Sequence, residues 1–325
     1  MDALSVPVRQ GSPEWAVARR SGIGGSDAPA VIGVSLYRSP YLLWAEKLGL
    51  VPAMTESEPM RWGRLLEAVV AQAYAERTGR RLRRVRRLLR SRARPWMLAS
   101  IDRAVVGEQR LVEIKTTRSP RWDGADPVPP DVLCQVQHYL AVTGWDVGDV
   151  AVLLAGSDLR ILEVPRDEAH IQELVEREAE FWHLIESRTP PPLDGSEATR
   201  RALSHLHPGD DGSQLAASAD TDRLLAQLQV ARRRLDAAER DEAAVENSLR
   251  AAMGDAALLI GPGYRVSFRK SADSLRVDWQ AVAAELKPDP SLVARFTTAR
   301  EGPRVLRVRF GANAPSELGG RDVAA

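Results

Sequence analysis

The chain has 325 residues, of which 44% are hydrophobic, and a formal net charge of +1; this length can bury the core of one full-sized domain and a smaller one. The near-neutral charge excludes binding to a polyanion through the net field alone, so a nucleic-acid surface would need an uneven distribution of charge. The single cysteine, Cys134, excludes an internal disulfide framework and a four-cysteine zinc or iron–sulfur site.

The first twenty residues lack the apolar centre of a signal peptide. No run in the chain approaches the roughly 18 apolar residues that a membrane helix needs. We therefore expect a soluble cytoplasmic protein with no membrane segment.

The first eighty residues are predicted to be mainly helical. A helix start at SPEW (12–15) precedes the glycine-rich turn GIGGSD (22–27), a short helix capped by Ser26 or Asp27, and a further helix over 41–48. Apolar residues at helical spacing then predict a helix over 60–78 that ends at Gly79. Glu67 lies off the centre of its apolar face.

Residues 82 to 188 alternate between strand and helix patterns. Three short β-rich segments, within 82–91, 96–106 and 110–116, read as an antiparallel meander. A helix over 131–144, strands near 150–155 and 160–164 and a helix over 167–188 follow. We therefore predict one α/β domain over residues 1–190.

The remainder is predicted to be a separate region. Residues 191–221 are rich in Pro, Gly, Ser and Asp and read as a linker. In 222–254 alternating steps of four and three predict a coiled-coil seam or helical arm. This helix could dimerise, dock a partner or pack intramolecularly, which we take as the default. Residues 255–325 are predicted to form a small α+β unit with a frayed end.

Asp102, Glu113 and Lys115 form the strongest candidate for chemistry. Alternation along a strand puts Glu113 and Lys115 on one face, and the preceding hairpin brings Asp102 alongside. Two carboxylates suit Mg²⁺, which with its bound water favours phosphodiester hydrolysis. Lys115 is one of only four lysines beside 41 arginines, and its compact ammonium can stabilise charge where the arginine fork would not serve. The alternative is a solvated cross-strand charge pair, worth about 0.2–1 kcal/mol.

Five ordered blocks surround these residues: 14–33, 60–74, 98–102 (LASID), 112–117 (VEIKTT) and 133–144. Together they resemble the YqaJ-type viral recombinases, relatives of phage lambda exonuclease in the PD-(D/E)XK nuclease superfamily. The resemblance extends over about residues 14–188. It implies an α/β fold with a restriction-endonuclease-like core, in which helices flank a central mixed β-sheet.

The resemblance also assigns catalytic and metal-binding roles. It implies that Asp102 and Glu113 are metal ligands assisted by the backbone carbonyl of Ile114, and that Lys115 is the catalytic lysine. Glu67 is implied as an additional active-site carboxylate and metal ligand. The expected cofactor is Mg²⁺, as two ions, with Mn²⁺ as a substitute.

Further positions are assigned to substrate. Gln135 and Gln137 resemble glutamines that follow the catalytic strands, and we expect Gln137 to face the site; the alternative is a pair of helix-surface amides. Arg19, Ser26 and Gln135 are expected to bind DNA near its 5′-phosphate, and the GIGGSD turn offers N–H groups to an anion. The alternative for that turn is a plain N-cap.

Two features depart from the family or lie outside its motifs. Arg103 stands where the family commonly has glycine after the metal aspartate, so its side chain could crowd the turn or contact a phosphate. Residues 80–94 contain nine arginines, which could line a DNA track or form a solvated face.

The implied function is a deoxyribonuclease of the recombination type. It would resect linear double-stranded DNA from the 5′ end in the cytoplasm of a bacterium or a phage-infected host, exposing a 3′ strand for a single-strand annealing protein. Relatives assemble as trimeric rings, which implies a homo-oligomer here. The alternatives are a PD-(D/E)XK endonuclease of restriction or repair and a catalytically inactive DNA-binding scaffold.

Overall fold

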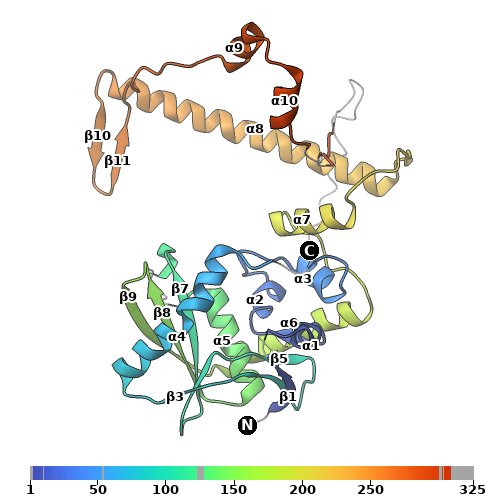
Figure 1. Ribbon diagram of the computed structural model, residues 1–325, viewed down its shortest axis with the longest axis vertical. Coiled ribbons are helices and arrows are strands. Elements are labelled where there is room, and N and C mark those ends of the chain that lie inside the picture. Colours follow the sequence, from blue (N-terminus) through green and yellow to red (C-terminus); the bar gives the residue numbers. More distant parts are fainter. Residues whose placement is uncertain are drawn as a thin grey trace, which may run out of the picture. The chain divides into compact units, whose positions relative to one another are not determined.

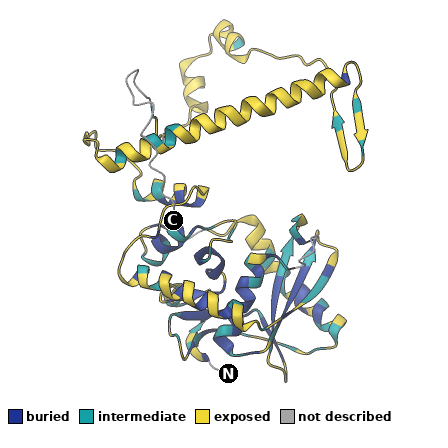
Figure 2. Ribbon diagram, turned by 180° about the vertical axis from the view of Figure 1, so that it is seen from behind, coloured by how far each residue is buried: buried dark blue, intermediate teal, exposed yellow. Residues whose placement is uncertain are grey.

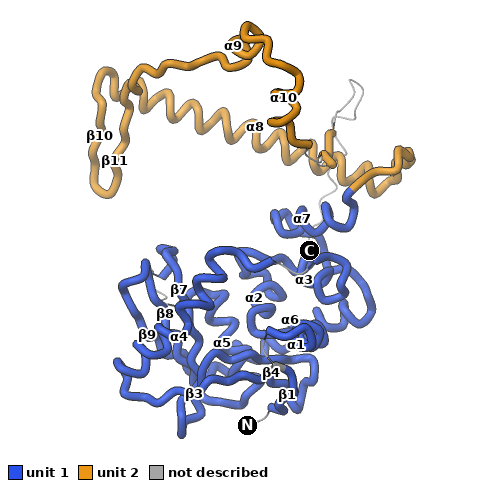
Figure 3. The backbone as a smooth tube through the Cα atoms, viewed as in Figure 1, with its two compact units in different colours: residues 1–208 blue, residues 209–325 orange. Residues whose placement is uncertain are grey.

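A computed structural model of the chain describes residues 3–9, 11–52, 55–122, 128–299, 302 and 304–308. The chain divides into two compact units, Met1–Pro208 and Gly209–Ala325 (Figure 3). No described helix is both long enough and apolar enough to cross a membrane.

The first unit is a mixed α/β domain (Figure 1). Its elements are β1 (Ala3–Arg9), α1 (Pro13–Arg20), β2 (Ile23–Gly24), α2 (Ala28–Val31), α3 (Pro40–Lys47), α4 (Glu58–Thr78), β3 (Leu82–Arg84), β4 (Arg87–Ser91), β5 (Met97–Ala99), β6 (Arg103–Val105), β7 (Arg110–Thr117), a 3₁₀ helix (Pro120–Trp122), α5 (Pro130–Thr143), β8 (Val147–Leu154), β9 (Asp158–Pro165), α6 (Glu168–Glu186) and α7 (Glu197–Leu206).

The main sheet has the strand order β3-β6-β7-β8-β9. It is mixed, because β7 pairs antiparallel with β6 and parallel with β8. Helix α4 covers one face, where Val70 and Tyr74 pack with Val112 of β7. Helix α5 covers the other, where Val136 packs with Leu111. The mixed sheet flanked by helices that the sequence predicts is confirmed.

A smaller sheet has the order β1-β4-β5-β2. The predicted antiparallel meander is confirmed in its pairing, because the first segment pairs with the second and the second with the third, each time antiparallel. The prediction missed that the meander is shared between two sheets. Its first two segments each break into two strands, one for each sheet: β3 and β4 in the first, β5 and β6 in the second. Strand β2 pairs in parallel with β5 through Ile23↔Met97 and Gly24↔Leu98. This places the GIGGSD turn beside the chain that leads into Asp102.

The boundary of the first unit differs from the predicted one. Helix α7 lies inside the expected linker 191–221, and the unit extends to Pro208 rather than to residue 190. Ala198 and Ala202 of α7 are buried against α3 residues such as Leu43. Thr199 Oγ1 donates a hydrogen bond to Ser39 Oγ at 2.8 Å. Small side chains let this helix pack closely, although the segment around it is rich in turn-forming residues.

The second unit contains α8 (Ala219–Met253), the hairpin β10 (Leu258–Gly261) and β11 (Tyr264–Ser267), α9 (Trp279–Leu286) and α10 (Pro290–Phe296). The expected helical arm is a single helix that begins at a Ser218–Thr221 capping box. Its seam residues Leu224, Leu235 and Val245 are exposed (Figure 2). Intramolecular packing of this seam stays a prediction. Residues 309–325, where a frayed end was expected, lie outside the described residues.

Candidate active site

Strand β7 carries the Glu-x-Lys pair at the centre of the main sheet. Side chains alternate between faces along a strand. Val112 and Ile114 pack in the cluster under α4, whereas Leu111 packs in the cluster under α5. Glu113 and Lys115 therefore face the α5 side, as a pair, as the sequence predicts.

Glu113 has one satisfied and one unsatisfied carboxylate oxygen. Its side chain is buried, and Oε1 accepts hydrogen bonds from Lys115 Nζ at 2.7 Å and from Gln135 Nε2 at 2.8 Å. Oε2 is buried and has no hydrogen-bond partner among the described residues. Leaving a buried acceptor unpaired costs about 1–3 kcal/mol. This oxygen is therefore a candidate ligand for a cation.

Lys115 is held as an ammonium between two acceptors. Nζ donates to Gln135 Oε1 at 2.8 Å as well as to Glu113 Oε1. Burial by itself lowers the pKa of Lys115, but the carboxylates of Glu113 and Asp102 outweigh it, so the pKa is raised. At neutral pH this side chain is a fixed positive charge beside two carboxylates, suited to stabilise negative charge on a phosphoryl group.

Asp102 lies immediately before β6, and its Oδ2 accepts a hydrogen bond from the Ile114 N–H at 2.9 Å. Burial, followed by repulsion from Glu113, raises the pKa of Asp102 well above its usual range. The hydrogen bond from Ile114 and the charge of Lys115 act against that rise and do not overcome it. A bound cation would therefore favour the ionised form of Asp102, which burial and Glu113 disfavour.

Asp102 and Glu113 together fit a hard divalent cation. Mg²⁺ is commonly held by one or two carboxylates, with waters and substrate phosphate completing its shell. Here Glu113 offers an unpaired buried oxygen and Asp102 an electrostatically disfavoured charge. Within the described ranges, no group of three or more His, Cys, Asp and Glu residues is placed to hold a metal.

The glutamine that faces this site is Gln135, not Gln137. Gln135 bridges Glu113, Lys115 and the hydroxyl of Tyr139, to which Nε2 donates at 3.0 Å. Gln137 Nε2 instead donates to the Pro165 carbonyl at 2.8 Å. The expectation for Gln137 is wrong because two positions on a helix differ by about 200°, which puts the amides on opposite sides of α5.

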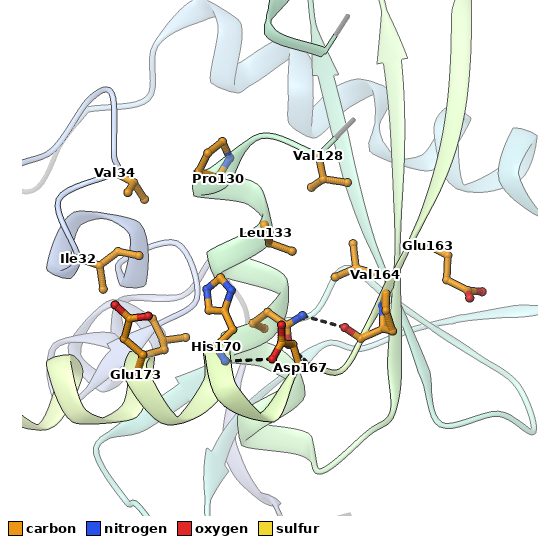
Figure 4. A pocket seen from close by; sticks show the side chains of 13 residues that line it. Ile32, Val34, Val128, Pro130, Leu133, Glu163, Val164, Asp167, His170 and Glu173 are labelled. Atoms are coloured by element: carbon orange, nitrogen blue, oxygen red, sulfur yellow. Dashed lines mark hydrogen bonds between the residues drawn. The ribbon is translucent and has the colours of Figure 1, made fainter. Parts of the chain in front are cut away.

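Gln137 borders a separate cavity of about 470 Å³. Figure 4 shows this cavity between the start of α5, the end of β9 and the first turns of α6, with Leu133 and Val164 near Asp167 and His170. Gln137 Oε1 accepts from the Asp167 N–H at 3.1 Å, so its amide joins α5 to the start of α6. Its role here is structural.

Glu67 comes from a different element, yet it lies near enough to Asp102 for its charge to contribute to the raised pKa of Asp102. It projects from α4, which covers the face of the sheet opposite to Glu113 and Lys115. Its Oε1 accepts hydrogen bonds from Arg103 Nη1 and from Arg84 Nη2, the latter at 3.2 Å. The Arg103 side chain is buried and paired with Glu67, so it points away from the turn that it was expected to crowd; its contact with a phosphate stays a prediction.

The GIGGSD turn lines a small cavity of about 170 Å³ with Trp15, Arg19 and Ser26 at its wall. Arg19 Nη2 donates to Ser26 Oγ at 2.8 Å, and its guanidinium lies 5.0 Å from the centre of the Trp15 ring. The structure thus brings together two of the three residues predicted to bind DNA near its 5′-phosphate, whereas the third, Gln135, lies against Glu113 and Lys115. A planar guanidinium of this kind matches phosphate geometry well.

A buried ion cluster, which the sequence did not reveal, supports this turn. The Asp27 carboxylate is buried and accepts from Lys47 Nζ and Arg38 Nη1, each at 2.6 Å, and from the Gly24 N–H at 3.0 Å. Lys47 also donates to the carbonyls of Arg19 and Gly22. Burial opposes the charged form of Asp27. The positive charges of Lys47, Arg19 and Arg38 outweigh burial and hold the pKa of Asp27 well below the usual range. The rarity of lysine could have singled out Lys47.

Tyr139 connects the turn to the carboxylate site. Its hydroxyl accepts from Gln135, and its ring lies against Gly25, where a β-carbon would be 2.3 Å from Tyr139 Cε1. Tyr139 also lines the cavity beside Arg19 and Ser26. Tyr139 therefore contacts both the cavity of the predicted phosphate-binding residues and the glutamine that bonds Glu113 and Lys115. Only glycine fits at position 25.

The arginine-rich segment 80–94 forms β3, β4 and their connections. Arg81, Arg83, Arg86 and Arg92 are exposed, whereas Arg80 and Arg84 are engaged with the carboxylates of Asp149 and Glu67. The exposed arginines give this side of the domain a local positive charge that the net charge of +1 conceals.

This region is similar to known proteins. Residues 14–146 match the family model for the YqaJ-like viral recombinase domain. The chain is 37% identical over 197 residues to the uncharacterized protein YqaJ of Bacillus subtilis (strain 168), an alignment that covers 58% of this chain and 61% of that protein. Protein D345L of African swine fever virus (strain Badajoz 1971 Vero-adapted) is 38% identical over 61 residues, 19% of this chain and 18% of that protein. A solved alkaline exonuclease, LHK-Exo from Laribacter hongkongensis, is 21% identical, with a TM-score of 0.48 over 60% of this chain and 100% of that chain.

Proposed function

We propose that the chain, whose residues 14–146 form a YqaJ-like viral recombinase domain, is a Mg²⁺-dependent exonuclease that resects linear double-stranded DNA from the 5′ end. The observation that carries the proposal is the unpaired, buried Oε2 of Glu113 beside Asp102 and the ammonium of Lys115. In metal-assisted phosphodiester hydrolysis, a carboxylate oxygen binds the cation and a fixed positive charge stabilises the negative charge on the phosphate.

The residues divide the work as follows. Asp102 and Glu113, with the Ile114 carbonyl, would hold Mg²⁺, which supplies Lewis-acid polarisation of the phosphate; Mn²⁺ is expected to substitute. Lys115 stabilises the charge that develops on the phosphoryl oxygens. Gln135 fixes both Lys115 and Glu113 through its two ends. Tyr139 in turn holds the Gln135 amide.

The bond changes explain why a phosphate pocket adjoins the site. A water oxygen bonds to phosphorus, the phosphorus–O3′ bond breaks, and O3′ leaves with a proton that the water supplies. The shortened strand then ends in a 5′-phosphate. The cavity with Arg19 and Ser26 is suited to bind that terminal phosphate, so each cut regenerates the group that the next cycle binds.

Substrate and partners follow from the family. The exposed arginines of segment 80–94 are proposed to contact the duplex backbone, with affinity that falls as salt rises. The 3′ strand left by resection would pass to a single-strand annealing protein, and copies of the chain would assemble around the DNA. Action in the cytoplasm of a bacterium or a phage-infected host remains a prediction.

Polarity is tested with a duplex that carries one radiolabel at the 5′ end or at the 3′ end of the same strand. The proposal expects the 5′ label to be released first, as a mononucleotide, while the 3′ label stays on a long strand. It also expects Arg19→Ala to reduce the ratio of the cleavage rate on 5′-phosphate ends to the rate on 5′-hydroxyl ends. Release of the 3′ label first would contradict the direction.

A further inference from the structure

Glu67 and Arg103 form a pair on the α4 side of the sheet, the face opposite to Glu113 and Lys115. Arg103 lies opposite Val112 in the β6–β7 ladder, and directly opposite residues project on the same face. Val112 packs under α4 with Val70 and Tyr74. The Arg103 side chain therefore points to α4, where Nη1 meets Glu67 Oε1.

The same guanidinium also contacts the main chain of the metal-ligand candidate. Arg103 Nη1 donates to the Asp102 carbonyl at 2.8 Å as well as to Glu67. The Asp102 side chain is held from the other direction by the Ile114 N–H at 2.9 Å. Asp102 is thus fixed at both its carbonyl and its carboxylate.

Glu67 has little freedom to join a metal site. Its Oε1 is shared by the guanidiniums of Arg103 and Arg84, and the Arg103 side chain is only 8% exposed. Moving Glu67 toward Glu113 would leave a buried arginine without its carboxylate, and removing one partner of a buried ion pair is strongly destabilising. The Oε1 atom of Glu67 is therefore committed to the two arginines.

We infer that Glu67 is a positioning residue rather than a metal ligand: it anchors Arg103, which fixes the main chain of Asp102 from the α4 side of the sheet. Arg103, which stands where a glycine was expected, thus helps to hold Asp102 in place. The inference rests on the proposed function only in treating Asp102 as a metal ligand. It revises the expectation that Glu67 helps to hold a second ion.

Mn²⁺ binding to the full chain, measured by isothermal titration calorimetry, tests the inference without turnover. Glu67→Gln keeps an oxygen for Arg103 while removing the charge a ligand needs. We expect its Mn²⁺ stoichiometry to be unchanged and its Kd to stay within about threefold of wild type, whereas Asp102→Asn should lose binding. Loss of an ion, or a tenfold weaker Kd, in Glu67→Gln would overturn the inference.

Kinetics supply a second readout. Glu67→Leu frees Arg103 and should lower kcat about tenfold or more with little change in KM, whereas Glu67→Gln should stay near wild type. Equal losses in the two variants would also overturn the inference. Arg64→Met is the matched control, because Arg64 lies on the same helix in an exposed pair with Glu56; circular dichroism checks the folding of each variant. A wild-type chain that cleaves no DNA would reject the proposed function, while the Mn²⁺ titration would still decide the role of Glu67.

Discussion

Gln135 and Gln137 are two buried amides on the same helix that bind opposite sides of the domain. Gln135 joins Lys115 to Glu113, and Gln137 joins the Pro165 carbonyl to the start of α6. Gln135→Leu should lower kcat about 10–100-fold, because groups that orient metal ligands have effects of that size. The measurement is steady-state cleavage of linear duplex.

Gln137→Leu is the control for that change. It should keep wild-type kcat but unfold at a lower temperature, because it leaves the Pro165 carbonyl and the Asp167 N–H unpaired. A loss of kcat in Gln137→Leu equal to that in Gln135→Leu would show that the two amides do not have separate roles.

Lys115 is predicted to act as a charge at a fixed point. Lys115→Ala should lower kcat about 10²–10³-fold, the usual cost of losing one preorganised donor to a developing oxyanion. Lys115→Arg should not restore the rate, because the broad guanidinium cannot occupy the position between Glu113 Oε1 and Gln135 Oε1. Single-turnover cleavage measures both variants, and near-normal rates in Lys115→Arg would show that charge alone suffices.

Metal affinity should depend on pH through Asp102. The pKa of Asp102 is raised by burial and by Glu113, and the cation competes with the proton for its carboxylate. Mn²⁺ binding should therefore weaken as the pH falls through the raised pKa, above the ordinary range of an aspartate. Calorimetric titrations between about pH 8 and pH 5 check this. An affinity that stays constant over that range would contradict it.

The metal-free protein should gain stability from Asp102→Asn. A raised pKa in the folded state means that the folded chain favours the protonated group, so wild-type stability falls as the pH rises from the ordinary aspartate pKa to the raised one. The amide carries no charge to bury. In thermal melts with EDTA, the variant should exceed the wild type by a margin that widens with pH up to the raised pKa. A stability difference that narrows as the pH rises would contradict the raised pKa of Asp102.

Gly25 should tolerate no side chain. In Gly25→Ala the new β-carbon would overlap the Tyr139 ring at 2.3 Å, and overpacking of this kind costs about 1–3 kcal/mol. Gly24→Ala is the matched comparison, because its nearest neighbour would be Asp27 Oδ2 at 3.5 Å. Denaturant unfolding should therefore rank Gly25→Ala well below Gly24→Ala in stability, and equal values would contradict the close approach of Tyr139.

The parts of the site that follow from strand periodicity were predictable from the sequence. Alternation along β7 is enough to put Glu113 and Lys115 on one face. Which of two nearby glutamines faces them depends on the rotation of α5 about its axis, which the family pattern and the spacing of Gln135 and Gln137 do not determine. Sequence reasoning chose the wrong one.

Features that depend on contacts between distant segments were missed. The placement of Glu67 follows from which face of the sheet α4 covers. The Asp27 cluster joins residues up to 28 positions apart, and no local pattern relates them. Helix α7 was hidden in a segment with linker-like composition, because its burial depends on the α3 surface that it meets.

The central claim is tested most directly by incubating the full chain with a linear duplex carrying 5′-phosphates, beside a closed circular duplex, in Mg²⁺ or in EDTA, with Lys115→Ala in parallel. The account predicts that only the linear DNA is degraded, and only by the wild-type chain in Mg²⁺. Cleavage of the circle would indicate an endonuclease, and intact linear DNA in Mg²⁺ would indicate a DNA-binding scaffold; either result would contradict the proposed exonuclease.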